Sequence, residues 1–90
     1  MIYNSKIGEI DLSKLTRLYP AAVVEMQGEE AEMSLEWIEM NEDKVNLKEY
    51  ILVFDFTPKN EEIRDKKILH FKTKDELIKT MQEVAQFFHP

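Results

Sequence analysis

The fold class is decided by residues 66–88, which read KKILHFKTKDELIKTMQEVAQFF. Leu69 and Phe71 alternate with Ile68 and His70, and this period of two predicts a β-strand. The pattern Thr-x-x-Glu that begins at Thr73 then predicts a helix start of the capping-box type. The apolar residues that follow share one face of a 3.6-residue period, which predicts an amphipathic helix. They are Leu77, Ile78, Met81, Val84, Ala85 and Phe88.

The first twenty residues contain a shorter version of this alternation between strand and helix. Residues 2–7 favour a strand that ends at Gly8. Asp11 is then expected to cap a short helix through residues 12–19, and Pro20 to end it, because proline disfavours helical conformation in the residue before it.

Residues 21–37 predict a β-hairpin. Gly28 permits a positive φ, so Gln27 and Gly28 are expected to form a tight turn between the strand 21–26 and a second strand. The second segment, 30–37, presents a conflict, since Glu, Ala, Met and Leu favour helix. Its apolar and polar residues nevertheless alternate, and we give this pattern more weight and predict a strand. The apolar side would hold Ala31, Met33, Leu35 and Trp37, and the polar side Glu30, Glu32, Ser34 and Glu36.

Residues 48–56 are apolar on both sides of an extended chain, which predicts a central strand. Consecutive strands with short connections favour an antiparallel meander of about five strands, with both helices covering one face. We therefore expect a single two-layer α+β domain over residues 1–90, with a short helix in the N-terminal half and a longer one at the C-terminus.

Composition restricts the classes of function. The 90 residues carry a net charge of −6 and no cysteine, which excludes disulfides, thiolate metal sites and cysteine catalysis. Residues 18–43 hold eight acidic and no basic side chains. Nucleic acid is therefore an unfavourable partner, because affinity for phosphate comes from lysine and arginine. The smaller basic cluster is interpreted as a solvated edge, with nucleic-acid contact as the weaker alternative. It comprises Arg64, Lys66, Lys67, Lys72 and Lys74.

Neither a secretory leader nor a membrane-spanning segment is predicted. The first residues lack a basic region followed by an apolar core, and no apolar run approaches the roughly 20 residues that a bilayer requires. We expect a cytoplasmic protein that does not enter a membrane.

The acidic hairpin is the first candidate site. As a strand, Glu30, Glu32 and Glu36 would project from one face of the sheet, with Glu25 beside them. Like charges on one face are unfavourable unless they are solvated or paired. A basic protein partner or a divalent cation would relieve the repulsion, and the plain alternative is a solvated surface screened by salt over about 10 Å.

Asp55 and His70 form the second candidate, a pocket for a small ligand or for catalysis. Asp55 interrupts an aromatic stretch, and either caps the turn at Thr57 and Pro58 or is a buried acid of raised pKa. The turn is the favoured interpretation. His70 lies on a strand, opposite in face to Leu69. The sequence has no nucleophile motif, phosphate-binding loop or zinc-ligand spacing, so catalysis is the less favoured interpretation and no cofactor or metal site is predicted.

An apolar second face of the sheet completes the prediction. Ile51, Val53 and Ile68 need a cover if both helices lie on the other face. Contiguous exposed apolar patches usually mark interfaces, so two copies are expected to pack sheet to sheet. The leading hypothesis is a protein-binding or regulatory module that acts as a homodimer, with the acidic hairpin attracting a basic partner.

Overall fold

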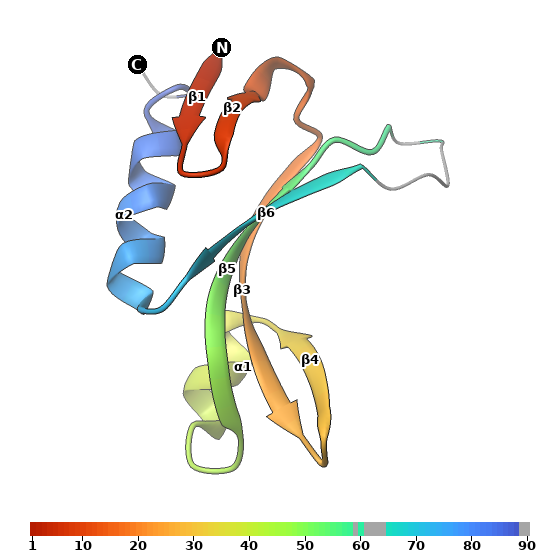
Figure 1. Ribbon diagram of the computed structural model, residues 1–90, viewed down its shortest axis with the longest axis vertical. Helices are drawn as coiled ribbons and strands as arrows, with labels where there is room; N and C mark the ends of the chain where they lie inside the picture. The colour runs from red at the N-terminus through yellow and green to blue at the C-terminus, as the bar shows by residue number, and fades with distance from the viewer. Residues whose placement is uncertain (59, 61–64, 89–90) are drawn as a thin grey trace.

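The computed structural model describes residues 1–58, 60 and 65–88. The elements pack as an α+β fold, so the predicted fold class is confirmed (Figure 1). The main sheet is antiparallel throughout, with strand order β4-β3-β5-β6, and β1 and β2 form a separate hairpin. In chain order the elements are β1 (Ile2–Ser5), β2 (Gly8–Asp11), the 3-10 turn η1 (Leu12–Lys14), β3 (Arg17–Met26), β4 (Glu29–Met33), α1 (Leu35–Asn41), β5 (Asn46–Asp55), β6 (Lys66–Phe71) and α2 (Lys74–Ala85).

The C-terminal strand and helix are confirmed. Thr73 is the N-cap of α2, and its hydroxyl oxygen accepts a hydrogen bond from the Glu76 amide at 3.2 Å. The Thr73 hydroxyl in turn donates to the Glu76 carboxylate at 3.3 Å. Leu77 and Val84 are fully buried, and Met81 packs partly beside them. Ile78, Ala85 and Phe88, which were predicted on the same face, are exposed, so capping and periodicity predicted the helix but too wide an apolar face.

The N-terminal predictions are wrong in two places. Gly8 begins β2 instead of ending a strand. The chain reverses direction after Ser5, so that Tyr3 of β1 pairs with Ile10 of β2. The expected helix at 12–19 is reduced to the turn η1, and Pro20 lies inside strand β3. Strand β4 pairs only with Ala22 and the residues after it, so β3 is at the sheet edge at Pro20, where proline is tolerated.

The β1–β2 hairpin is held against α2 and the sheet by Tyr3. Its ring stacks on Phe54 with centroids 6.4 Å apart and meets the edge of Phe87 at 6.1 Å. The Tyr3 hydroxyl donates to the Glu83 carboxylate at 3.1 Å. Burial of the ring and this hydrogen bond raise the pKa of Tyr3. The two ends of the described chain therefore lie side by side (Figure 1).

The predicted strand 30–37 is correct only as far as Met33. The turn at Gln27 and Gly28 forms as expected, with positive φ at both residues. Ser34 then caps α1, accepting a hydrogen bond from the Trp37 amide. Leu35, Glu36 and Trp37 are thus helical, and the intrinsic propensity of this segment outweighs its alternation. In α1, Ile38 is buried against Ala22 and Val24 of β3.

The two faces of the main sheet differ in cover. Leu52 and Phe54 of β5 point into the core formed with α2 and the hairpin, and α1 packs on the same side farther along β3. Both helices therefore lie on one face, as predicted, although the short helix is α1 rather than residues 12–19. The opposite side, which we call the open face, clusters only strand residues among those described. It carries Tyr19, Ala21, Val23, Ile51, Val53 and Ile68.

Candidate protein-interaction surface

The centre of the open face is apolar. Ile51 and Val53 of the central strand β5 are shielded by Tyr19, Val23 and Ile68, which themselves remain partly exposed. The register places Val53 between Tyr19 and Ile68. This surface is the one that the sequence predicted would lack a helical cover. No helix residue in ranges 1–58, 60 and 65–88 joins its cluster.

A basic group lies at one end of the open face, and we call it the basic end. The Arg17 guanidinium stands 4.3 Å from the Tyr19 ring centroid, and the Lys66 ammonium donates to the Tyr19 hydroxyl at 3.1 Å. The Arg17 guanidinium lies over the Tyr19 ring, an arrangement that attracts a cation electrostatically, whereas the Lys66 ammonium lies at the hydroxyl edge of the ring. Asp55 is the third member, paired in register with both Arg17 and Lys66. Sequence reasoning missed this group because β3 and β6 are far apart in the chain.

Asp55 serves the turn at the end of β5. Its carboxylate accepts a hydrogen bond from the Thr57 amide at 2.9 Å. The hydrogen bonds from Thr57, with Lys66 and Arg17 nearby, hold the pKa of Asp55 below its usual value. The favoured turn interpretation is confirmed, and the alternative of a buried acid with raised pKa is wrong.

The acidic residues gather at the other end of the open face, which we call the acidic end. Glu25 pairs directly with Glu30, and Glu32 pairs with Val23, so all three project from the open face. Glu36, the fourth predicted member, lies on α1 instead. The predicted acidic hairpin therefore exists with three of its four residues.

Lys48 is a member of the acidic end that the sequence did not indicate. The register between β3 and β5 shifts at Val23 and Val24, which leaves Lys48 as an extra residue in β5. Its ammonium lies 2.7 Å from the Glu25 carboxylate, and this hydrogen bond raises the pKa of Lys48. Such bulges re-aim a side chain, and here the bulge supplies a counter-ion to the hairpin.

His70 and Glu49 flank the apolar centre. The His70 Nδ1 atom lies 2.8 Å from the Glu49 carboxylate, and both side chains are well exposed. His70 pairs with Ile51, four positions from Asp55 along β5, so the two predicted pocket residues stand roughly 13 Å apart. They share the open face but do not converge on one point.

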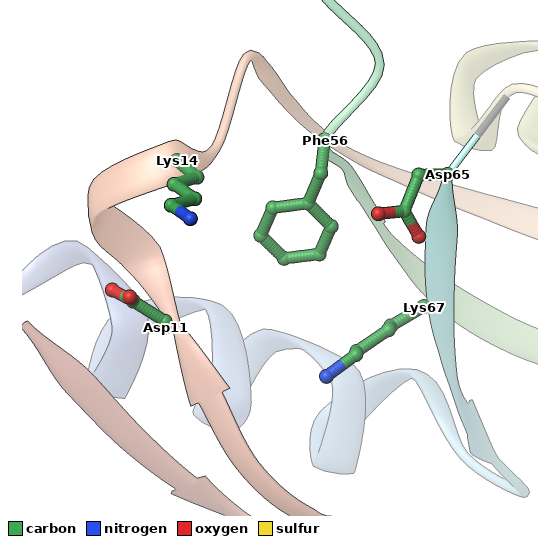
Figure 2. A pocket seen from close by; sticks show the side chains of 5 residues that line it. All are labelled: Asp11, Lys14, Phe56, Asp65 and Lys67. Carbon is green, nitrogen blue, oxygen red and sulfur yellow. The ribbon is translucent and has the colours of Figure 1, made fainter. Parts of the chain in front are cut away.

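Two hollows lie near these groups. One of about 320 Å³ opens at the β3 edge beside Pro20, where β4 has ended, and both Arg17 and Glu32 line it. The other, of about 200 Å³, lies beside the ring of Phe56 and is drawn in Figure 2. The Lys14 and Lys67 ammonium groups turn toward the space beside this ring (Figure 2). Because Phe56 packs with the α2 core, this second hollow lies on the side of the sheet opposite to Asp55 and His70.

The predicted basic edge is divided between the two faces. Lys66 belongs to the basic end of the open face, and Lys67 pairs with Phe54 on the helix-bearing side. Lys74 is bound to Glu39 of α1 at 2.7 Å. Arg64 lies outside the described residues.

The described residues were also compared with the requirements of a metal site and of a membrane-spanning helix. Among these residues, no three histidine or carboxylate side chains come close enough to hold a metal ion. Neither α1 nor α2 has the length and apolar character needed to cross a bilayer. Comparison of the chain with protein-family models, curated proteins and solved structures gave no significant match.

Proposed function

We propose that this protein is a protein-binding module that acts as a homodimer through the open face of its sheet. The observation that carries the proposal is the group of half-exposed apolar side chains Tyr19, Val23 and Ile68, which lie over the buried Ile51 and Val53 and are joined by no helix residue among those described. Burying apolar surface contributes about 25 cal/mol per Å², so Tyr19, Val23 and Ile68 gain from a protein partner. Charged groups at both ends would form the polar rim that protein interfaces usually have.

The acidic end gives this surface a preference for basic partners. Glu25 is paired with Lys48, whereas no ion pair joins Glu30 or Glu32 to another described residue. Carboxylates arranged in this way attract a basic surface and increase the association rate, with a dependence on ionic strength. The hairpin would thus attract and orient a basic partner at the edge of the face that the homodimer buries.

Sedimentation equilibrium of the wild-type chain and two variants tests the proposal. Ile68→Asp places a charge in the apolar centre, and Ile78→Asp places the same charge on the exposed side of α2 as a matched control. We expect the wild type and Ile78→Asp to dimerise and Ile68→Asp to be a folded monomer by circular dichroism. An unchanged dimer in Ile68→Asp would refute the open face as the contact surface.

A second candidate function is the binding of a small ligand, in the hollow beside Phe56 rather than at Asp55 and His70, which were predicted for it and lie on the other side of the sheet. The hollow beside Phe56 favours a ligand site at the end of β5, because two ammonium groups face an aromatic ring there, with the carboxylates of Asp11 and Asp65 also in the lining. Titration with inorganic phosphate and with succinate, followed by NMR, tests it. A saturable shift of the Phe56 signals that disappears in Lys67→Ala supports this function, and an absence of shifts at millimolar ligand contradicts it.

A further inference from the structure

We infer that a methionine-rich surface beside α1 is the docking site for a basic amphipathic helix of another protein. The surface lies on the helix-bearing side of the sheet, behind the acidic end, and we call it the methionine patch. It is made of Met26, Ala31, Met33, Trp37 and Met40. The inference goes beyond the proposed homodimer, because it uses the opposite side of the sheet and a different partner.

The β3–β4 hairpin supplies the floor of the methionine patch. Val24 is buried under Ile38 of α1, so Ala31, its partner across the strands, faces the same side of the sheet. Met26 and Met33 lie two positions from Val24 and Ala31 and therefore share this side. Both methionines are only partly buried, and among the described helices only α1 joins this cluster. The helix-side face of β4 thus lacks a helix of its own.

The flank of α1 supplies the wall. Strand order places β4 on one side of β3 and places β5 and β6, which carry α2, on the other. Glu39 is bound to Lys74 at the start of α2, so the side of α1 that carries Glu39 faces α2. Trp37 is two positions away and hence on the opposite side of the helix, toward β4.

Met40 extends this wall to the outer surface of the molecule. It lies three positions after Trp37, so the two side chains are neighbours on α1. Met40 is 81% exposed, the highest exposure of a large apolar side chain among the described residues. Wall and floor together form an apolar step at the end of the molecule that lies away from α2 (Figure 1).

The step has the dimensions of a seat for one helix. Neighbouring strands lie about 4.8 Å apart and packed helices about 8–10 Å apart, so a helix beside α1 would rest on β4 and its outer edge. The five residues of β4 span about 17 Å, the length of about eleven helical residues. Such a helix would present apolar anchors at every third or fourth position to the patch. Methionine suits this role, because its unbranched thioether adapts to the shape of its partner.

The charges around the methionine patch specify a basic partner. Glu29 pairs with Met26 at the end of the floor, and Glu36 lies four positions before Met40 on the wall. Neither carboxylate forms an ion pair with another described residue. Residues 18–43 contain no lysine or arginine to offset them. Lysine or arginine side chains along a docked helix would therefore meet carboxylates on both of its flanks.

The same charges select against other occupants. Nucleic acid and anionic lipid would bring phosphate groups to a surface surrounded by carboxylates. A second copy of the chain would bring its own net charge of −6 to this end. A basic helix from a different protein satisfies both the apolar step and its acidic surroundings.

Trp37 provides a direct readout of docking, because it is the only tryptophan of the chain. The probe is a designed helical peptide of about 14 residues with leucine along one face and lysine along the other. A matched peptide carries glutamate in place of lysine. We expect the lysine peptide to shift the Trp37 emission to shorter wavelength with a dissociation constant on the order of 10 μM, and the glutamate peptide to cause no shift. No shift with about 500 μM lysine peptide, or equal binding of the two peptides, overturns the inference.

Two variants with the same added charge locate the site. Met40→Lys places an ammonium group in the methionine patch, and Ile78→Lys places one at an exposed position of α2 as the matched control. Circular dichroism confirms that both remain folded. We expect Met40→Lys to weaken binding of the lysine peptide by about tenfold or more and Ile78→Lys by less than about twofold. Equal affinities in the two variants would show that the peptide binds elsewhere.

Ile68→Asp separates this inference from the proposed homodimer. The substitution disrupts the open face, so it should abolish the homodimer and leave the Trp37 response to the lysine peptide in place. Peptide binding that is lost in Ile68→Asp and retained in Met40→Lys would assign the peptide to the open face. Vesicles that contain phosphatidylglycerol complete the test. A Trp37 shift with these vesicles as large as with the lysine peptide would assign the patch to a lipid surface and overturn the inference.

Discussion

The Ser34 hydroxyl oxygen accepts a hydrogen bond from the backbone amide of Trp37 at 3.1 Å, at the point where β4 ends and α1 begins. The bond satisfies one of the amide groups that a helix start leaves without an internal partner. It also sets the direction in which α1 leaves the sheet, so that Ile38 is buried against Ala22 and Val24.

Loss of this cap should destabilise the fold measurably. We expect Ser34→Ala to lower the free energy of unfolding by about 1 kcal/mol, because alanine has no acceptor for the Trp37 amide. Ser34→Asp keeps an acceptor at the same position and should remain near the wild-type value. Urea denaturation followed by circular dichroism measures both. If Ser34→Ala unfolds at the same urea concentration as the wild type, the cap does not stabilise α1.

The cap also shows why local sequence predicted one helix and not the other. At α2, the capping residue and the apolar period both indicate a helix, and the prediction was correct. At α1, the alternation of Ala31, Met33, Leu35 and Trp37 continues past the cap and imitates a strand. At residues 12–19, Asp11 does accept a hydrogen bond from the Ser13 amide, but long pairing of β3 with β5 extends the chain soon afterwards. A local sequence pattern does not reveal such pairing between strands that are far apart in the chain.

In the candidate site too, local sequence predicted the residues of one hairpin but not those that long-range strand pairing brings together. Glu25, Glu30 and Glu32 were predicted together because one hairpin holds them. The basic end joins Arg17, Tyr19 and Lys66 from strands that only the sheet order brings together. Lys48 enters through a change of register, which depends on how two distant strands pair. Long-range pairing thus determines what the sequence could not reveal about this surface.

Substitutions that disfavour positive φ in the turn of the β3–β4 hairpin should lower the free energy of unfolding. Gln27 has φ of 53° and Gly28 has φ of 82°, as in a type I′ turn. Because L-residues are disfavoured there, we expect Gly28→Ala to lower the free energy of unfolding by about 1 kcal/mol. No atom lies within 4 Å of the added methyl group, so steric contact would not contribute. Gln27→Asn should raise stability slightly, since asparagine tolerates this region. A Gly28→Ala protein of unchanged melting temperature would contradict the turn type.

Truncating a side chain on the helix-covered face of the sheet should lower the free energy of unfolding more than truncating one on the open face. Leu52 is fully buried under α2 and the hairpin, so Leu52→Ala should cost about 2–5 kcal/mol. This is a large share of the roughly 5–13 kcal/mol expected for a chain of this length. Ile68→Ala removes a partly exposed side chain from the open face and should cost about 1 kcal/mol in the monomer. Urea denaturation below 1 μM protein keeps dimerisation out of the comparison. Equal losses at the two sites would mean that the open face is covered within the chain.

Asp55 should make stability depend on pH in the acid range. Its folded pKa is lowered by hydrogen bonds from Thr57, so the ionised form is favoured in the native state. The stabilisation that ionised Asp55 gives to the folded state is therefore complete above the pKa of Asp55 in the unfolded chain, about 3.9. It is lost as the pH falls through the pKa of Asp55 in the folded state. Asp55→Asn removes this dependence, so its stability deficit relative to the wild type should be constant from pH 5 to 7 and should shrink below about pH 4. Thermal denaturation across this range measures the deficit, and NMR titration of the Asp55 carboxyl carbon should give a midpoint below the ordinary aspartate value. A deficit that grows with acidity would show that the neutral form of Asp55 is the one the fold prefers.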